Sequence, residues 1–482
     1  MAKYHYDVTI IGGGSGGLTA ARLAAALGAR TALIDKERLG GDCLNYGCVP
    51  SKVLIHVARV VHLAKSSLGL GLLPANVPAN VPANWQIDMA RISAHVQQVI
   101  GRVAEGEKVY VEHVSVRFGR ATFRSNHELD LNGERMLSKN FLIATGSRPR
   151  IPAIEGVKEV GYFTNEDLFD LQKLPASLAI VGGGPVGVEM AQAFARLGSQ
   201  VTLLQGPARI LPKEDPEVSE TISHVLEREG IRIETGARVQ RLSRQGNKKV
   251  AEARQGEQTL RIEADEVLLA LGRAPNVEGL NLEAARVAYD QHGIQTNVYL
   301  QTTAANISAI GDVIGGHLFT HIAAYQAGVA VRNLLVPIGR KKVNYTVLPW
   351  VTFTDPEAAR VGLTEDEALQ QGQRFRVIRF PWHAIDRAQT DGSLDGFIKL
   401  IVSEKSDTIL GAHLVGSRAG ELLGELTLAM QHHLSSQDIL ATIHAYPTLS
   451  TGVQQTAFEA YLKSAALSSA RRIIRPLLSW RG

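Results

Sequence analysis

Residues 8–17 read VTIIGGGSGG, a short β-branched run that leads directly into a glycine-rich turn. An Ala- and Leu-rich stretch of helical character follows, and a second β-branched run, residues 31–34, ends at Asp35. Three glycines of the turn have the spacing G-x-G-x-x-G: Gly12, Gly14 and Gly17. Because these glycines stand between a strand pattern and a helix pattern, they predict a strand–turn–helix–strand unit.

The same pattern recurs 170 residues further along the chain. Residues 178–187 read LAIVGGGPVG, and a helical stretch and a strand, residues 201–204, follow before Gln205. The glycines again have the spacing G-x-G-x-x-G: Gly182, Gly184 and Gly187. In such a unit the first glycine makes a tight turn, the second lets the backbone approach a pyrophosphate, and the third lets the helix pack on the strand. Two units of this kind predict two dinucleotide-binding sites.

The residue that closes each unit bears on which dinucleotide it binds. The carboxylate of Asp35 can accept a hydrogen bond from a ribose 2′-hydroxyl and would repel a 2′-phosphate, which suits FAD or NAD. Gln205 is uncharged, and Arg209 just after it is either a contact for a 2′-phosphate or a solvated surface arginine. We therefore expect FAD at the first site and NADP, in preference to NAD, at the second.

Residues 40–52 read GGDCLNYGCVPSK and contain both cysteines of the chain, Cys43 and Cys48. One turn-like or helical segment can bring the two sulfurs within disulfide reach. A helix that begins near Cys48 would lower the pKa of its thiol, and Lys52 one turn later adds positive charge. The alternatives are two inert buried thiols and a structural zinc half-site, but zinc needs further ligands and the chain has no other cysteine. We predict a redox-active pair and no metal site.

The composition limits the classes to which the chain can belong. Its 482 residues are too many for one compact core, and its formal net charge of +4 is too small to indicate nucleic acid binding. Two cysteines do not make a disulfide-stapled secreted protein. No apolar run approaches the length of about 18 residues that spans a bilayer, and no targeting segment precedes the strand at residues 7–11. A cytoplasmic location is the default expectation.

The cysteine motif closely resembles the active-site signature of the class I pyridine nucleotide–disulfide oxidoreductases, which include dihydrolipoamide dehydrogenase, glutathione reductase and mercuric reductase. The resemblance covers residues 5–462. Further segments resemble the family's two chain crossings, its second FAD motif and its interface domain: residues 144–149 (ATGSRP), 270–276 (ALGRAPN), 309–313 (AIGDV), 353–357 (FTDPE) and 409–413 (ILGAH).

The resemblance implies an α/β fold with two Rossmann-like dinucleotide-binding domains and a C-terminal α+β dimerisation domain. The expected parts are a discontinuous FAD-binding domain at 1–152 and 274–343, a NAD(P)-binding domain at 153–273, a dimerisation domain at 344–463 and a basic amphipathic tail at 464–482. It also implies a homodimer whose active sites use the C-terminal segment of the partner.

The resemblance also implies roles for individual residues. Cys48 would face the flavin and form the charge-transfer complex, and Cys43 would attack the substrate. Lys52 would lie near flavin N5, paired with Glu189 of the second unit's helix. The other expected cofactor contacts outside the glycine turns are Asp35, Lys36, Gly41, Ala121, Thr145, Gly146, Ser147, Gly272 and Asp312, of which Ala121 would meet the adenine side and Asp312 the ribityl chain.

Residues 444–451, HAYPTLST, depart from the family pattern. Members that reduce disulfides carry a His-Pro pair followed by an orienting Glu, whereas this chain has Tyr446 and Thr451 at those positions. A tyrosine hydroxyl titrates near pH 10 and is a poor base at neutral pH. His444 is an alternative base, although a structural role is the more frequent one for such a histidine. Mercuric reductases also carry a tyrosine near this position, but their extra C-terminal cysteines are missing here.

Three functional hypotheses follow. The first is electron transfer from NAD(P)H through FAD to a Cys43–Cys48 disulfide and on to a small-molecule or protein disulfide. The second is a mercuric-reductase-like reduction of a metal ion or a quinone. The third is a flavoprotein redox sensor or scaffold without turnover.

Two segments lie outside these hypotheses. Residues 74–84 read PANVPANVPAN and predict an extended surface loop. The basic, amphipathic tail at 464–482 is interpreted as a terminal helix packed on the dimer or a frayed end, in preference to a contact with an anionic membrane surface. Pro476 is expected to interrupt any long helix there.

Overall fold

The computed structural model describes residues 4–67, 71, 86–336 and 338–479, so the predicted loop at 74–84 lies outside the described residues. The chain divides into two compact units. The first contains Met1–Ala176, Gly246–Lys249 and Asp265–Asn344, and the second contains Ser177–Gln245, Val250–Ala264 and Tyr345–Gly482. The division into three domains and a tail that the family resemblance implies stays a prediction.

The helices and strands of the first unit are β1 (Tyr6–Ile11), α1 (Ser15–Ala26), β2 (Thr31–Asp35), α2 (Gly41–Asn45), α3 (Cys48–Ser66), α4 (Met89–Glu107), β3 (Ser115–Phe118), β4 (Ala121–Ser125), β5 (Glu128–Leu131), β6 (Glu134–Ile143), β7 (Ser147–Pro149), α5 (Val157–Val160), β14 (Glu266–Leu269), β15 (Arg273–Pro275), β16 (Tyr289–Asp290), β17 (Gly293–Ile294), β18 (Ile307–Ala309) and α8 (Thr320–Leu335).

A parallel sheet with the strand order β3-β2-β1-β6 forms the centre of the first unit, and β18 pairs with the other side of β6. Ile11 of β1 is level with Ile34 of β2 and Ile143 of β6, and Ile143 is level with Ala309 of β18. Because parallel strands share a carboxyl edge, the loops that follow these strands leave the sheet at the same edge. Ligands of open parallel sheets bind at that edge.

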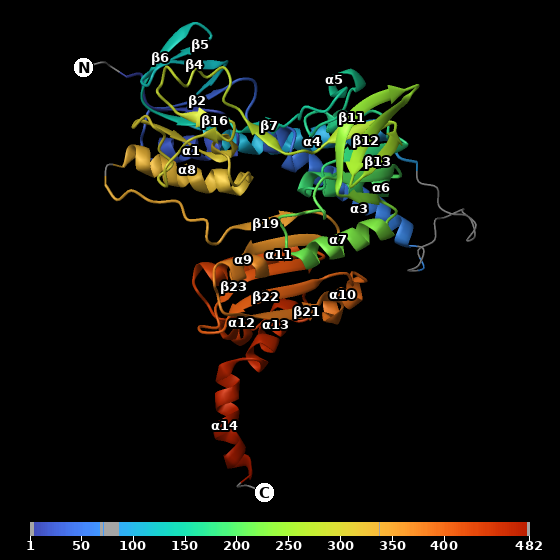
Figure 1. Ribbon diagram of the computed structural model, residues 1–482. Helices are drawn as coiled ribbons and strands as arrows, with labels where there is room; N and C mark the ends of the chain where they lie inside the picture. Colours follow the sequence, from blue (N-terminus) through green and yellow to red (C-terminus); the bar gives the residue numbers. More distant parts are fainter. Residues whose placement is uncertain (1–3, 68–70, 72–85, 337, 480–482) are drawn as a thin grey trace. The chain divides into compact units, whose positions relative to one another are not determined.

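Sterics explain why glycines follow β1. Gly12 has φ +109°, and a Cβ there would lie 2.2 Å from the Ala144 carbonyl oxygen. A Cβ on Gly17 would lie 1.8 Å from the Gly12 carbonyl oxygen. Only a residue without a side chain lets α1 pack this closely on the turn. Helix α1 also packs against α8 (Figure 1).

The second unit contains β8 (Ser177–Val181), α6 (Pro185–Leu197), β9 (Gln200–Gln205), α7 (Pro216–Arg228), β10 (Arg232–Thr235), β11 (Ala237–Gln245), most of β12 (Lys248–Gln255), β13 (Gln258–Ala264), β19 (Pro349–Thr352), β20 (Glu357–Gly362), α9 (Glu365–Gln370), β21 (Phe375–Pro381), α10 (Asp386–Asp391), β22 (Phe397–Ser403), β23 (Ile409–Gly416), α11 (Ala419–Gln431), α12 (Ser436–Ala441), α13 (Thr451–Leu462) and α14 (Ala465–Ser479).

The second unit repeats the geometry of the first glycine turn. Strands β8, β9 and β10 are parallel, and α6 connects β8 to β9. Gly182 has φ +116°, and a Cβ on Gly187 would lie 1.8 Å from the Gly182 carbonyl oxygen. The predicted internal repeat is therefore confirmed.

The C-terminal part of the second unit is an antiparallel sheet with the order β19-β20-β23-β22-β21. Its core joins side chains from the sheet with others from α11, α12 and α13. Two parallel-sheet units and this α+β part agree with the predicted α/β fold class.

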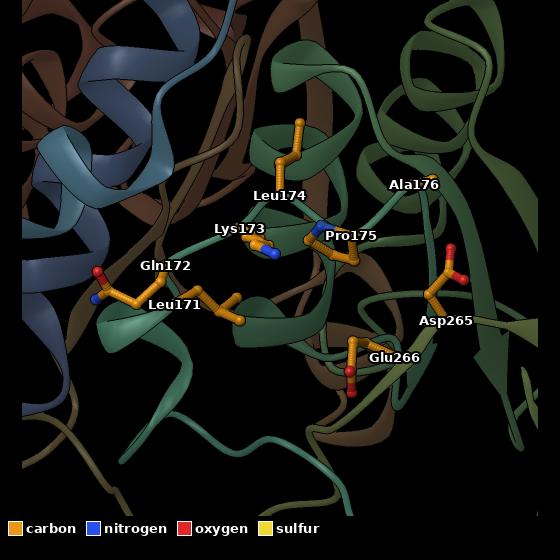
Figure 2. Close-up of a pocket in the computed structure, with 8 residues that line it drawn as sticks. All are labelled: Leu171, Gln172, Lys173, Leu174, Pro175, Ala176, Asp265 and Glu266. Carbon is orange, nitrogen blue, oxygen red and sulfur yellow. The ribbon is translucent and has the colours of Figure 1, made fainter. Parts of the chain in front are cut away.

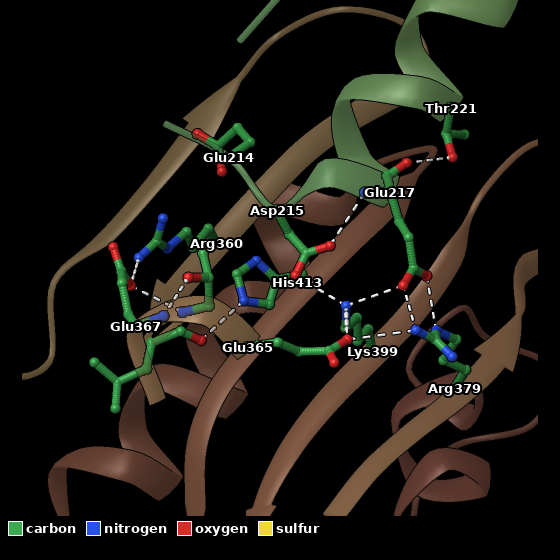
Figure 3. Close-up of polar contacts among 12 residues, drawn as sticks. Glu214, Asp215, Glu217, Thr221, Arg360, Glu365, Glu367, Arg379, Lys399 and His413 are labelled. Carbon is green, nitrogen blue, oxygen red and sulfur yellow. Dashed lines mark hydrogen bonds and ion pairs between the residues drawn. The ribbon is translucent and has the colours of Figure 1, made fainter. Parts of the chain in front are cut away.

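A buried charge cluster joins α7 to the C-terminal sheet (Figure 3). Lys399 on β22 has 1% of its side chain exposed, and its Nζ lies 2.9 Å from Asp215 Oδ2 and 3.1 Å from Glu217 Oε1. Burial disfavours the ammonium charge, but hydrogen bonds to Asp215 and Glu365 raise the pKa of Lys399 above its usual value. The Asp215 side chain also caps α7 by accepting from Glu217 N. The cluster thus holds the start of α7 on the sheet.

Two expectations from the sequence are wrong. Helix α14 runs through Pro476 instead of ending before it. Pro476 lies in the last turn, where its missing N–H removes one hydrogen bond and few residues follow that a kink could displace. Among the described residues, the stretch Gly41–Ser66 does contain an 18-residue window with the length and composition of a membrane span, with a mean hydropathy of 1.2. It is weak evidence for a span, because helices of protein cores pass the same test.

The pocket drawn in Figure 2 lies in the first unit, beside residues 171–176 and the acidic pair Asp265 and Glu266. None of the predicted site residues lines it.

The glycine geometry yields a paired prediction. Gly187→Ala should lower the free energy of unfolding by about 3 kcal/mol, because its Cβ would overlap a backbone oxygen that cannot move away. Gly184→Ala should leave stability unchanged, since nothing lies within 4 Å of its Cβ, and should instead raise the KM for the nicotinamide dinucleotide. Chemical denaturation and steady-state kinetics measure the two effects. Equal stability of the two variants would contradict the packing role of Gly187.

Candidate active site

The first glycine turn is held by the residue that closes its unit. Asp35 Oδ2 accepts a hydrogen bond of 2.7 Å from Gly13 N, and Oδ1 accepts from Glu37 N and Arg38 N. Lys36, which lies between Asp35 and Glu37 in the sequence, is exposed. Gly14 precedes α1 in an extended conformation and offers no side-chain cap. The N-terminus of α1 therefore presents backbone N–H groups and a partial positive charge, as a pyrophosphate requires.

The cysteine segment packs directly on this turn. Gly40 N donates a hydrogen bond of 2.8 Å to Gly13 O. Gly41 has φ +57°, and a Cβ there would lie 2.7 Å from Gly14 Cα. The glycine at position 41 therefore lets the cysteine segment contact the turn that would hold the pyrophosphate. The residues present fit a bound dinucleotide at this turn, next to the segment that carries the cysteines.

The second glycine turn uses an amide where the first uses a carboxylate. Gln205 Oε1 accepts a hydrogen bond of 2.7 Å from Gly183 N, and Gln205 Nε2 donates to Arg209 O. Arg209 is half-buried, and its Nη2 donates to the backbone oxygens of Pro212 and Glu214. The interpretation of Arg209 as a fully solvated surface arginine does not describe this geometry. The same turn architecture without the acid leaves this site free of the charge that would repel a 2′-phosphate.

Helix α3 begins at Cys48, as the sequence predicts, and Pro50 occupies its first turn. Cys43 lies in α2 and is half-buried, whereas Cys48 is exposed. Thr320, the first residue of α8, places its Oγ1 3.4 Å from Cys48 Sγ. Neither cysteine is bridged in the structure.

The environment treats the two thiols differently. A hydrogen bond from Cys43, one from Thr320 and the charge of Lys52 outweigh burial and the charge of Asp42, and lower the pKa of Cys48 to about 6. The hydrogen bond with Cys48, followed by burial, raises the pKa of Cys43. At neutral pH the pair therefore exists as a Cys48 thiolate next to a Cys43 thiol. A thiolate is the reactive form of a cysteine.

A network around Arg273 lies beside the cysteines, and reasoning from the sequence missed it. Arg273 Nη2 lies 3.0 Å from Asp42 Oδ1, and its Nε donates to Ser147 Oγ at 2.6 Å. Ser147 Oγ donates in turn to Asp312 Oδ2 at 2.5 Å. Burial raises the pKa of Asp312. Asn165 Nδ2 also donates to Asp42 Oδ1, so the carboxylate just before Cys43 is fixed from two sides.

The network connects three motifs that lie far apart in the sequence. Arg273 belongs to the ALGRAPN motif, Asp42 to the cysteine motif and Asp312 to the AIGDV motif. The sequence does show that each of these three residues belongs to a motif. The spacing of the motifs along the chain, however, does not show that the three side chains are in contact.

The remaining cofactor candidates of the first unit gather at the paired strands β7 and β15 and at β4. Thr145 Oγ1 donates to Asn276 O at 2.7 Å, and Gly146 O accepts from Asn276 N. Gly272 has φ +95°, and its oxygen accepts from Arg150 N. Ala121 begins β4 and is buried.

Glu189 is buried within α6, and its Oε1 accepts a hydrogen bond of 2.9 Å from Phe353 N. Lys52 Nζ donates to Ser51 Oγ. Lys52 belongs to the first unit and Glu189 to the second, so their pairing stays a prediction.

In the described C-terminal segment both candidate bases, Tyr446 and His444, are engaged by other residues. The Tyr446 hydroxyl donates to Asp386 Oδ2 at 3.0 Å, and this hydrogen bond raises the pKa of Tyr446. His444 Nε2 lies 2.8 Å from Glu425 Oε1, and Nδ1 lies 2.9 Å from Thr442 O. Both ring nitrogens of His444 are therefore engaged by oxygen atoms of the chain itself. The geometry favours the structural role for His444.

The site's geometry can now be compared with known proteins. A family model described as "Pyridine nucleotide-disulphide oxidoreductase" matches residues 6–328. The chain belongs to this family. The model of the family's dimerisation domain matches residues 348–457, which supports the expected homodimer. The family binds FAD together with a pyridine nucleotide, so the predicted class of FAD-binding oxidoreductase is confirmed.

Three relatives indicate the range of the family around this chain. The chain is 36% identical over 457 residues to a mercuric reductase of Bacillus cereus, which covers 94% of the chain and 71% of the relative. It is 36% identical over 472 residues to a dihydrolipoyl dehydrogenase of Thermus scotoductus, covering 95% and 98%. The structure of RclA, an HOCl-induced flavoprotein disulfide reductase of Escherichia coli, matches with a TM-score of 0.84 and 29% identity, covering 95% of this chain and all of that one.

We expect Arg273 to act as a positioning residue for the Cys48 thiolate. In Arg273→Gln the charge of Asp42 would lose its counter-ion, and the pKa of Cys48 should rise from about 6 to about 7. The additional change Asp42→Asn removes that charge and should restore the lower value. The pH dependence of Cys48 alkylation in the reduced protein, with the labelled site identified by mass spectrometry, measures the pKa.

Arg148→Gln is the matched control, because Arg148 pairs with Glu278 in the same pair of chain crossings but is not bonded to Asp42. An unchanged Cys48 pKa in Arg273→Gln, or a double variant that fails to restore it, would show that Arg273 is only a structural contact.

Proposed function

We propose that this protein passes electrons from NAD(P)H through FAD to a Cys43–Cys48 disulfide and from there to a disulfide-type acceptor. The carrying observation is the asymmetric thiol pair, a Cys48 thiolate and a Cys43 thiol, seated on the first glycine turn. The proposal includes a homodimer in a cytoplasmic location.

The chain's own residues divide this work. FAD, when bound, accepts a hydride from the nicotinamide and delivers two electrons. The first glycine turn, Asp35 and the N-terminus of α1 would bind its phosphates and ribose. The lowered pKa of Cys48 keeps this sulfur negative, while Cys43 keeps its proton until it attacks the acceptor. A disulfide acceptor RSSR is then reduced to RSH and RS⁻ as the Cys43–Cys48 bond forms again, with one mixed disulfide in between. The Cys43 thiol supplies one proton, and solvent supplies the proton that converts RS⁻ to the second thiol.

A specific observation supports a second acceptor class. Reduction of a disulfide requires a proton donor for the leaving thiolate, yet the Tyr446 hydroxyl donates its proton in a hydrogen bond to Asp386 and both ring nitrogens of His444 contact oxygen atoms of the protein. Reduction of a soft metal ion by two electrons requires no such protonation. Curated relatives include mercuric reductases, and matching structures include a Cu(II) complex of RclA. We therefore keep a thiophilic metal ion as the second candidate substrate.

The reductase hypotheses are tested by anaerobic reduction followed by a panel of acceptors. NADPH should bleach the flavin and produce a long-wavelength thiolate–flavin absorbance, whereas a sensor without turnover should show little of either. Disulfides, Hg(II) and quinones are then supplied to wild type and to Cys43→Ser. The variant should lose disulfide and metal reduction, each by at least about 100-fold, and keep direct transfer to quinones.

Lipoamide or glutathione disulfide turnover at rates typical of efficient enzymes would show that the missing base is unimportant. Thr320→Ser is a matched control at the same site, because it keeps the hydroxyl group that lies beside Cys48.

We also propose NADPH as the preferred donor, because Gln205 replaces the acid and Arg209 lies just beyond it on the same loop. Arg209→Gln should raise the KM for NADPH about tenfold and leave that for NADH nearly unchanged. Gln205→Glu should shift preference toward NADH by adding the repelling charge. Initial-rate kinetics with both donors measures the change, and a variant that loses both donors equally would argue for a purely structural Arg209.

A further inference from the structure

The last described helix, α14, belongs to a segment that carries only positive charge. The sequence after Glu459 contains no acidic residue and five basic ones: Lys463, Arg471, Arg472, Arg475 and Arg481. The three arginines within α14 are exposed, and none forms an ion pair with another described residue. Their charge is therefore available to an anionic partner.

The same helix exposes large apolar side chains. Ile473, Ile474 and Leu478 are 69%, 49% and 68% exposed, and they take no part in the core of the C-terminal sheet. Ile474 and Leu478 are four residues apart and lie in line with Leu467 and Ala470, while Ile473 widens the stripe. The helix thus has one apolar face that the described chain leaves uncovered.

Two of the three arginines of α14 border that face, and Arg472 lies on the polar side of the helix. Arg471 and Arg475 are also one turn apart, and at about 100° per residue they lie beside the stripe of Ile474 and Leu478. From this border a long arginine side chain can reach past an apolar surface to a charged layer above it. This arrangement is typical of helices that lie in the plane of a membrane interface.

We propose that α14 binds the surface of an anionic lipid bilayer, with Ile473, Ile474 and Leu478 in the outer acyl region and the three arginines at lipid phosphates. This goes beyond the proposed redox function and does not depend on it. It is an alternative to the expectation that the tail is a terminal helix packed on the dimer or a frayed end, and the experiment below separates the two.

Other occupants fit the observations less well. Two copies of α14 would bring like charges together, and the helix offers no carboxylate to compensate them. Nucleic acid would meet the arginines but leave the apolar stripe in water. A bilayer with anionic headgroups can bury the apolar face of the helix and bind its arginines at the same time.

The test uses the purified, FAD-loaded full-length protein. Flotation with vesicles of phosphatidylcholine alone is compared with flotation in an equal mixture of phosphatidylcholine and phosphatidylglycerol. Binding to the anionic vesicles should be at least about tenfold tighter, and added salt should weaken it. Equal binding to the two vesicle types, or none to either, overturns the proposal.

Two variants test the two faces separately. The triple variant Arg471→Gln/Arg472→Gln/Arg475→Gln should lose at least about tenfold in affinity for anionic vesicles. Ile474→Gln/Leu478→Gln should lose a similar amount while keeping the charge. The control triple variant Arg238→Gln/Arg241→Gln/Arg244→Gln removes the same charge from strand β11 and should bind like wild type.

Light scattering and NADPH-dependent flavin reduction complete the experiment. All variants should remain dimers that reduce their flavin in solution, which separates failure of this proposal from failure of the proposed function. A tail variant that becomes monomeric would assign α14 to the second copy of the chain and overturn the lipid assignment.

Discussion

The contact between the cysteine segment and the first glycine turn is the constraint on which the site of the first unit depends. Gly40 N bonds to Gly13 O, and Gly41 approaches Gly14 more closely than any side chain would permit. This contact fixes where α2 and α3 begin relative to the parallel sheet. A site for transferring electrons between a dinucleotide and a disulfide requires such a fixed relation, because the groups must meet without rearrangement.

Electrostatics at this place separates two chemically identical side chains. Cys48 lies at a helix start, accepts hydrogen bonds and is stabilised as a thiolate by the positive charge of Lys52. Cys43, in contrast, donates a hydrogen bond to Cys48 and is partly buried. Asp42 opposes the thiolate, and Arg273 holds Asp42 in an ion pair. The opposite pKa shifts of the two thiols thus arise from their surroundings.

The second unit shows how a repeated local motif acquires a different environment. Its glycine turn has nearly the backbone geometry of the first, but Gln205 stands where Asp35 does, and Arg209 binds the loop that follows. The same loop leads to Asp215, whose buried pair with Lys399 fixes the start of α7. Removing one partner of such a buried ion pair lowers the free energy of unfolding by about 3–5 kcal/mol, so this ion pair contributes to the rigidity of the loop.

The sequence by itself determined the two glycine turns, the cysteine pair and the absence of the His-Glu base. Each of these is a matter of residue type at short, regular spacing, where local sterics and helix geometry decide the outcome. Only the tertiary structure decided that Arg273 joins Asp42 and Ser147, that Thr320 lies at Cys48, and that Glu425 engages His444. These partners are far apart in the chain and are brought together by packing. A sequence pattern does not give the distance in space between its residues. The tail follows the same division: its charge pattern is visible in the sequence, but the continuity of α14 through Pro476 and the exposure of its apolar face depend on what the fold leaves uncovered.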